Sequence, residues 1–406
     1  MVAILTHVFG VGNLTLVEDV VQDALARALQ TWPFQGIPKD PSAWILRAAR
    51  NRALDVVRRE RRFREKEAEI VRVFDRSASA PDAPDASDAF EAGITDDCLR
   101  MMFVCCHPEV PAKAQAALAL KTLCGFGVTE ISRAFLSTEA AITKRLTRAR
   151  QSIRDAAIPF EIPEGGALAP RLDGVLRTLY LLFNEGYKAS VGDRLVREDI
   201  CREAIRLTSL LADHPAGDQP RTHALLAVML LNAARLPARV DDAGHLLRLR
   251  EQDRSRWDRT AIARGIFHLA RSAAGDTVST YHLQAGIAAC HTVAPSDGQT
   301  DWRRILELYD QLMEFDASPV VALNRAIVVA CVAGPRAGLD AVAAIPDRDK
   351  LEGYYLLYAV LGELECRRRD LLTAAGWFRK ASQLAEVKSE REFLQRRFEE
   401  CAAALA

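Results

Sequence analysis

The apolar residues of this chain recur at helical spacing almost from end to end. Residues 14–32 carry an apolar stripe that includes Val20 and Ala24, opposite a face of acidic and polar residues, and this pattern predicts a helix after a shorter one over residues 2–10. Three prolines and a glycine interrupt the period over residues 32–41, so a loop is expected there. The next apolar period begins at once, which predicts closely spaced helices.

The helix predicted over residues 41–62 has a strongly uneven charge. Asp40 is placed to cap it, and Pro41 fits its first turn. Trp44 lies on the apolar stripe, which favours a place in the core over a platform for stacking a base. Residues 47–66 hold nine Lys and Arg against three Asp and Glu. A helix face that is merely solvated usually interleaves both signs, so this excess favours a polyanionic partner.

The composition changes after residue 73. Residues 74–97 contain seven acids, one arginine, two prolines and no sustained apolar period, which predicts an acidic linker. From residue 98 the helical pattern returns, and a short helix over residues 129–135 precedes another that begins near Ser137. This spacing is typical of a helix-turn-helix, although ordinary helical hairpins share it. In the last helix Lys144 and Arg148 face away from the apolar side, where a recognition helix reaches phosphates and base edges.

The remaining residues, 158–406, are also predicted to be helical, which makes the expected fold all-α. Near the end, a large-small-large spacing fits a tetratricopeptide repeat, and upstream copies of it are weaker. Its positions are Tyr358, Leu361, Gly362, Ala374, Phe378 and Ala381. The helices predicted before it cover residues 172–184, 198–212, 222–236, 243–249, 259–273, 280–291, 302–314 and 320–332, with two more before the end.

Composition narrows the class of protein. The 54 Lys and Arg balance the 54 Asp and Glu, so the basic stretch is a local feature. Nine cysteines without a C-x-x-C favour reduced thiols, and Cys105, Cys106 and His107 are expected to pack in a helix rather than bind zinc. The sequence has neither an apolar run of about 18 residues nor a recognisable signal peptide at its start, which predicts a cytoplasmic protein outside the membrane.

The sequence also lacks the common catalytic motifs. There is no H-E-x-x-H, no G-x-S-x-G and no phosphate loop, and His282 and His291 are expected to be ordinary core or surface residues. We therefore expect no enzyme, no cofactor and no metal.

The two basic modules together resemble a known family. Residues 14–62, which include VEDVVQDALARAL and PSAWILRAARNRALDVVRRERR, resemble region two of extracytoplasmic-function (ECF) RNA polymerase sigma factors, and residues 98–155 resemble their region four. The stretch before Gly10 is shorter than the first helix of region two in those factors. The resemblance implies that core RNA polymerase, through its β′ clamp helices and β flap, and promoter DNA are the partners.

The resemblance also assigns roles to residues. Polymerase binding at the β′ clamp helices would fall on Asp19, Gln22, Asp23 and Arg27. The minus-ten element would be melted and read by Arg47, Arg50, Asn51, Arg58 and Arg59, with Asp55 as an intrahelical partner of Arg58 or Arg59. The minus-thirty-five element would be read as duplex by Thr143, Lys144, Thr147 and Arg148.

The long C-terminal part resembles the tetratricopeptide-like extension of one group of these factors. The resemblance lies in the segments LYLLFNEGY, EQDRSRWDR, STYHLQAGIAACH and SPVVALNRAI. It implies control through the extension, in cis or by a bound partner, in place of a membrane-bound anti-sigma factor. The expected domains are region two over 1–73, the linker over 74–97, region four over 98–157 and the extension over 158–406.

Two other functions are compatible with parts of this pattern. A conventional helix-turn-helix regulator would use the repeats to sense a ligand or a partner. A scaffold or enzyme would carry the basic segments incidentally, which two basic modules joined by an acidic linker make the weakest hypothesis. An ordinary regulator has no need of the first 70 residues, so the sequence favours a sigma factor.

Overall fold

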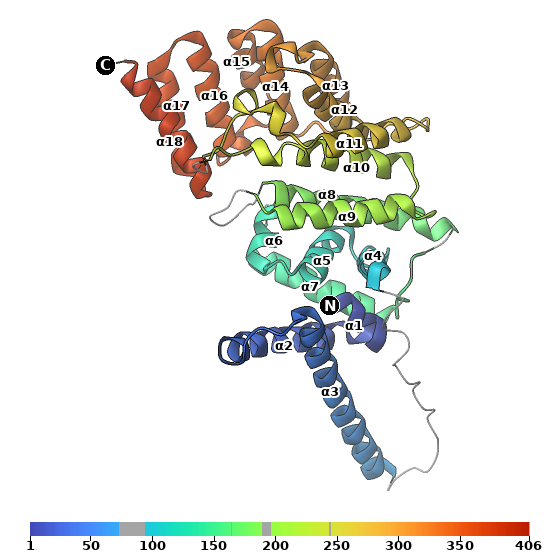
Figure 1. Cartoon of the computed structure of the whole chain (residues 1–406). Helices are drawn as coiled ribbons and strands as arrows, with labels where there is room; N and C mark the ends of the chain where they lie inside the picture. Colours follow the sequence, from blue (N-terminus) through green and yellow to red (C-terminus); the bar gives the residue numbers. More distant parts are fainter. Residues whose placement is uncertain (73–93, 136, 164, 189–195, 243–244, 406) are drawn as a thin grey trace. The chain divides into compact units, whose positions relative to one another are not determined.

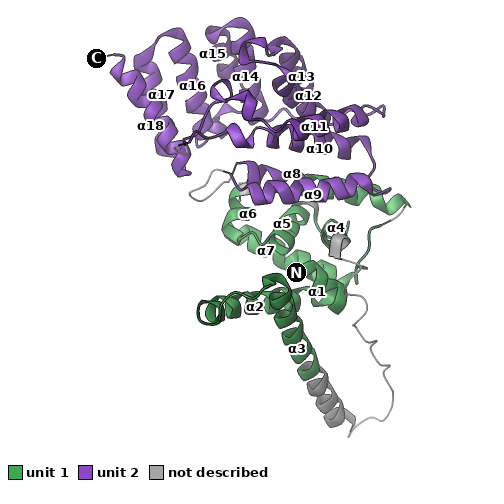
Figure 2. Ribbon diagram, viewed as in Figure 1, with its two compact units in different colours: residues 1–178 green, residues 179–406 purple. Residues whose placement is uncertain are grey.

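The computed structural model describes the chain except for residues 73–93, 136, 164, 189–195, 243–244 and 406, and it describes only the backbone of residues 60–72, 94–96, 112 and 134. The described residues form helices throughout and contain no β-strand, only one isolated bridge between Val240 and Leu246. The predicted all-α fold is confirmed. Two compact units divide the chain, residues 1–178 and residues 179–406 (Figure 2).

Unit 1 consists of short and medium helices with one long helix, α3 (Figure 1). Its helices are α1 (Val2–Phe9), α2 (Leu14–Gln35), α3 (Pro41–Arg72), α4 (Ile94–Cys105), α5 (Ala112–Cys124), α6 (Val128–Ala134), α7 (Glu139–Asp155) and the first half of α8 (Leu168–Tyr187).

Local signals set the ends of α2 and α3. Helix α2 continues three residues beyond the predicted Trp32 and ends at Gly36, whose φ of 82° suits a residue without a side chain. Helix α3 begins where expected, because the carboxylate of Asp40 accepts the N–H of Ala43 at 2.9 Å. That cap supplies an acceptor for one of the N–H groups that the first turn leaves unpaired.

Most of the predicted linker lies outside the described residues, but its last four residues, 94–97, belong to α4. The domain boundary expected after residue 157 does not coincide with the division between the two compact units, because unit 1 continues to residue 178, within α8. Gly174 lies so close to α5 that a Cβ there would be 2.6 Å from the side-chain oxygen of Gln115. The Cys106 thiol lies 3.9 Å from the Thr178 hydroxyl, and burial raises its pKa to about 12. Cys106 therefore packs as a small apolar residue, although it lies just after the end of α4 and not in a helix as predicted.

In unit 2, helices that are consecutive in sequence pack against one another, for example α10 with α11, α12 with α13 and α16 with α17. The unit begins with the second half of α8. Its further helices are α9 (Glu198–Asp213), α10 (Pro220–Ala233), α11 (Arg259–Ser272), α12 (Thr280–Val293), α13 (Trp302–Phe315), α14 (Pro319–Ala333), α15 (Pro335–Ala343), α16 (Tyr355–Arg368), α17 (Leu371–Leu384) and α18 (Lys388–Ala403).

Two sequence predictions for unit 2 are wrong. The described residues after 334 form four α-helices, not two. The helix predicted over 243–249 is absent from the described part of that stretch, where Asp241 accepts the N–H of His245 at 2.7 Å and closes a loop. A short polar side chain that binds nearby backbone in this way competes with helix formation, and an apolar period alone does not reveal it.

The spacing that suggested a tetratricopeptide repeat corresponds to one packed hairpin, α16 with α17. Gly362 of α16 faces the ring of Phe378, and a Cβ at Gly362 would lie 2.9 Å from that ring. Phe378 belongs to a core of unit 2 that includes Leu361 and Ala374, and Gly362 is buried beside it. The small residue is thus required by the bulk of the aromatic ring opposite it.

Candidate nucleic-acid interface

Helices α2 and α3 form one platform because their apolar stripes face each other. Val20 and Ala24 of α2 share a buried core with Ile45 and Ala49 of α3. Trp44 is half-buried against this core and meets Trp32 edge to face, with ring centroids 5.6 Å apart. Its place in the packing agrees with the predicted core role.

The polar side of α3 is directed to solvent. The predicted DNA-binding residues on it are largely exposed, with Arg50 half-buried: Arg47, Arg50, Asn51, Arg58 and Arg59. Among the described residues none of these arginines forms an ion pair, so their guanidinium groups are available to phosphate. Asp55 forms no ion pair with Arg58 or Arg59 among the described residues, and it lines a small pocket between α3 and α2.

The predicted polymerase-binding residues lie on the solvent side of α2. All four are exposed: Asp19, Gln22, Asp23 and Arg27. Asp23 and Arg27 line the same small pocket as Asn51 of α3, and Asp23 lies 3.6 Å from Arg52. The structure therefore brings part of the predicted polymerase-binding set next to part of the predicted DNA-binding set.

The second basic surface is one side of α7. Ile142, Leu146 and Ala149 are buried, whereas the predicted DNA-binding residues Thr143, Lys144, Thr147 and Arg148 are all exposed. The Thr138 hydroxyl caps the helix by accepting the N–H of Ala141 at 3.2 Å. Glu130 similarly accepts the N–H of Gly127 at 2.7 Å and fixes the start of α6. The two caps fix the starts of two successive helices, and the second has an exposed polar face.

The hydroxyls of this face bind their own backbone. Thr143 donates to the carbonyl of Glu139 at 2.9 Å, and Thr147 donates to the carbonyl of Thr143 at 3.0 Å. Each hydroxyl oxygen keeps a free lone pair, while Lys144 and Arg148 form no ion pair with a described residue. This face can therefore donate to phosphates and exchange hydrogen bonds with base edges.

Sequence reasoning missed a polar contact that ties the N-terminal module to α5 and α7. Glu18 of α2 accepts a hydrogen bond from Thr122 at 2.8 Å and pairs with Arg150 at 2.9 Å. Both charged side chains are largely buried, with 16% and 20% of their surface exposed. Glu18 and Arg150 lie on predicted amphipathic helices, but no signal in the sequence pairs residues so far apart.

The described residues contain neither a candidate membrane-spanning helix nor a candidate metal site. In that part of the chain, no helix has both the length and the apolar character needed to cross a membrane. No group of three or more His, Cys, Asp or Glu residues is placed there to hold a metal ion.

Comparison with known proteins gives family matches in two parts of the chain. Residues 1–63 match the family Sigma-70 region 2, and residues 171–273 match a family of unknown function, DUF6596. Uncharacterized protein R00370 of Rhizobium meliloti (strain 1021) is 39% identical over 394 residues, which cover 96% of this chain and 91% of that protein. No solved structure matches. The chain therefore belongs to the same family as this Rhizobium meliloti protein, and it begins with a domain of the sigma-70 region 2 type.

Proposed function

We propose that the chain is an RNA polymerase sigma factor of the ECF subfamily that binds core polymerase and directs promoter-specific initiation. The observation that carries the proposal is the presence of two exposed basic helix faces, on α3 and α7, in a chain whose first residues match Sigma-70 region 2. A region 2 domain implies contact with polymerase and promoter DNA. Such a protein acts in the cytoplasm and needs no catalytic group of its own.

Each face takes one role in this proposal. Helix α2 binds the β′ clamp helices through its exposed acidic side, and α3 reads the minus-ten element once the strands separate. There its arginines bind the phosphates of the displaced strand. Helix α7, in a helix-turn-helix with α6, reads the minus-thirty-five element as duplex, while this module contacts the β flap. Phosphate contacts supply most of the affinity and a few side chains supply the sequence preference.

The helical hairpins of unit 2 form the regulatory extension in this proposal. Supporting it is the α16–α17 hairpin, where Gly362 packs against Phe378 and the two residues have the sequence spacing typical of a tetratricopeptide repeat. The extension controls initiation either in cis or through a bound partner. Helices α5 to α7 would also serve a conventional transcription regulator, and the transcription experiment separates the two functions.

The decisive experiment is run-off transcription by core RNA polymerase on a promoter library, with the full-length protein. We expect specific initiation with the wild type and at least a tenfold loss with Arg58→Ala/Arg59→Ala, because both exposed guanidinium groups lie on the strand-binding face. Arg303→Ala, an exposed change on α13 in unit 2, is the control and should initiate normally. Duplex binding without any initiation would favour the conventional regulator.

The polymerase-binding role of α2 has its own test. Asp19→Lys/Asp23→Lys reverses two exposed charges and should weaken core polymerase binding by about tenfold, which is 1.4 kcal/mol, without changing duplex affinity. Fluorescence anisotropy of the labelled protein measures its affinity for core polymerase. Anisotropy of a labelled promoter duplex measures the affinity of the protein for DNA. Asp276→Lys/Asp349→Lys, two exposed acids of unit 2, control for net charge. Unchanged polymerase affinity would refute the assignment to α2.

A further inference from the structure

Unit 2 contains a groove that none of the proposed roles uses. It has a volume of about 550 Å³ and lies among α10, α12, α13, α14 and the second half of α8. We call it the unit 2 groove. Aromatic and aliphatic side chains such as Tyr309 and Leu312 line it, together with polar groups from several helices. A concave site of this size with a few polar groups on mostly apolar walls is typical of ligand binding.

The wall of the unit 2 groove contains one described arginine, Arg235, which lies just after α10. Its guanidinium is partly buried, donates one long hydrogen bond of 3.5 Å to Gln252 and lies 5.8 Å from the centre of the Trp257 ring. Among the described residues it forms no ion pair, and burial lowers its pKa. The nearby cations Arg239 and Arg254 lower that pKa further.

Three other arginines of the same unit share an anionic partner. Arg248, Arg250 and Arg397 all pair with Glu363, at 3.0, 2.7 and 2.9 Å. The acid that lines the groove, Asp316, is exposed and accepts the N–H of Ser318 at 3.0 Å. Removing a cation from water without an anion is costly, so the surroundings of Arg235 favour a carboxylate from outside the chain.

Neutral polar groups line the same groove. His291 lines the groove, and burial, with Arg235 and Arg254 nearby, lowers its pKa to about 4, so the ring is neutral near pH 7. Its Nδ1 is buried without a hydrogen-bond partner in the described part of the chain. The side-chain amides of Asn184, Gln284 and Asn324 also line the groove and bind no described residue. Such amides can both donate to and accept from a peptide-like backbone.

We propose that the unit 2 groove binds a ligand that carries a carboxylate on an amide backbone, with Arg235 as its ion-pair partner and Asn184, Gln284 and Asn324 as partners of the amide groups. An acidic peptide segment and a small N-acylated amino acid share this chemistry. The proposal concerns unit 2 alone and does not depend on the sigma-factor assignment.

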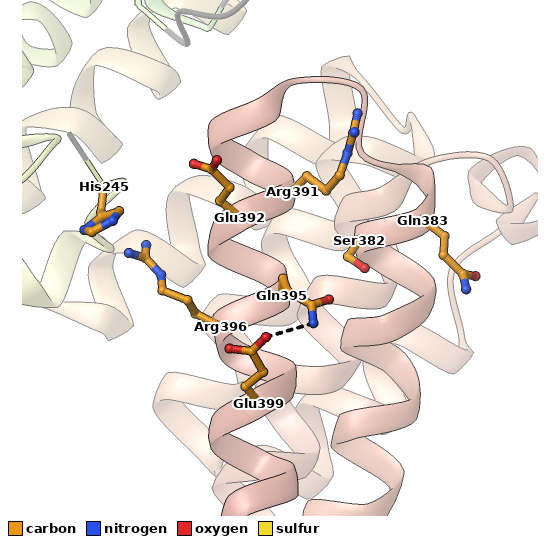
Figure 3. Close-up of a pocket in the computed structure, with 8 residues that line it drawn as sticks. All are labelled: His245, Ser382, Gln383, Arg391, Glu392, Gln395, Arg396 and Glu399. Atoms are coloured by element: carbon orange, nitrogen blue, oxygen red, sulfur yellow. Dashed lines mark hydrogen bonds between the residues drawn. The ribbon is translucent and has the colours of Figure 1, made fainter. Parts of the chain in front are cut away.

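Another hollow of unit 2 supplies the control. It has a volume of about 900 Å³ and is lined by His245 and by side chains of α17 and α18 (Figure 3). Its charges are of both signs, and several have partners: Gln395 donates to Glu399 at 3.0 Å, and Arg391 donates to the carbonyls of Ala385 and Glu386. Arg396 in this hollow is therefore a matched arginine outside the proposed site.

Calorimetric titration of the full-length protein tests the proposal. The probes are N-acetylglutamate, succinate and two pools of end-blocked hexapeptides, one with Asp or Glu at a varied position and the other with Asn or Gln there. We expect an acidic probe to bind at least tenfold more tightly than its amide counterpart. If N-acetylglutamate and the acidic peptide pool bind with equal affinity, a small N-acylated acid is sufficient as the ligand. If only the acidic pool binds, the ligand is a peptide segment. Absence of binding by every carboxylate probe overturns the proposal.

Variants locate the binding. Arg235→Met keeps the side-chain volume and should lower the affinity at least tenfold, whereas Arg396→Met should leave it unchanged. Equal affinity of folded Arg235→Met and the wild type overturns the proposal. If circular dichroism shows that Arg235→Met does not fold, Asn324→Ala decides, because Asn324 is exposed and its side chain binds no described residue. A threefold or greater loss in Asn324→Ala supports the site, and unchanged affinity refutes it.

Discussion

Helix α7 of unit 1 and the unit 2 groove both present arginines, but in opposite surroundings. Arg148 of α7 is exposed, so its charge costs little while no partner is bound. Arg150, two residues on, is largely buried and has Glu18 as its partner at 2.9 Å. Arg235 is partly buried and has neither full hydration nor an anionic partner among the described residues.

This difference in hydration and pairing indicates a different kind of partner for the exposed Arg148 and for the partly buried Arg235. A solvated cation attracts a polyanion over a distance and through many weak contacts, and salt weakens that attraction. An enclosed cation without an anion destabilises the free protein, so a single bound carboxylate has much to gain there. The first arrangement suits DNA and the second suits a small or local anionic group.

The largest expected effect concerns the pH dependence of unit 2. The pKa of His291 is about 4 in the folded protein and near 6.5 when unfolded, so between these values only the unfolded chain binds the proton. The folded protein therefore has its full stability above pH 6.5. It loses about 3 kcal/mol of its free energy of unfolding as the pH falls to about 4, because only the unfolded chain gains a proton at His291. Urea titrations across this range should show a shallower slope for His291→Gln than for the wild type. The exposed His245→Gln should keep the wild-type slope.

The next effect tests the paired arginine. Glu18→Gln removes the carboxylate that holds Arg150 and Thr122, and it should destabilise unit 1 by about 2 kcal/mol, because a largely buried cation loses its partner. Asp19→Asn, an exposed change on the same helix, should stay within about 0.5 kcal/mol. Equal unfolding midpoints for the two variants would show that the Glu18 contact contributes nothing.

Glu18 also shows where sequence reasoning stops. The cap of α3 joins Asp40 to Ala43, three residues away, and the buried stripe of α7 follows from helical spacing, so both could be predicted. The Glu18–Arg150 pair joins residues on different modules, and nothing local distinguishes Glu18 from Asp19 beside it. The extension of unit 1 into α8 depends likewise on the distant contact between Gly174 and Gln115.

The candidate sites divide in the same way. The exposed positions of α2, α3 and α7 could be predicted because a helix separates its polar and apolar faces by period alone. Their binding roles rest on resemblance and remain predictions. The unit 2 groove could not be predicted, since it gathers Arg235, His291 and Asn324 from separate helices. The sequence predicted His291 to be an ordinary core or surface residue, and it gave no binding role to Arg235 or Asn324.

A smaller effect is expected on the solvated face. Lys144→Ala/Arg148→Ala should lower promoter-duplex affinity by about tenfold and reduce the slope of log K against log salt concentration by about two, because two phosphate contacts are lost. Stability should change by less than about 0.5 kcal/mol, since both side chains are exposed. Anisotropy titrations at several salt concentrations measure the slope. An unchanged slope would place the DNA-binding face elsewhere.

The last expected effect, a gain in stability, is the most specific to the comparison. Arg235→Met removes an enclosed cation, keeps most of its volume and relieves repulsion from Arg239 and Arg254. The ligand-free protein should therefore gain about 1 kcal/mol, since well-packed apolar replacements of enclosed charges are often stabilising. Urea denaturation measures the gain, and Arg396→Met, from the hollow with opposing charges, should show none. If the variant instead loses 2 kcal/mol or more of its free energy of unfolding, Arg235 is a structural residue. Its hydrogen bond to Gln252 and its contact with the Trp257 ring would then stabilise the fold. A gain in stability together with a loss of carboxylate binding would show that unit 2 retains this arginine for its ligand, at a cost to the free protein.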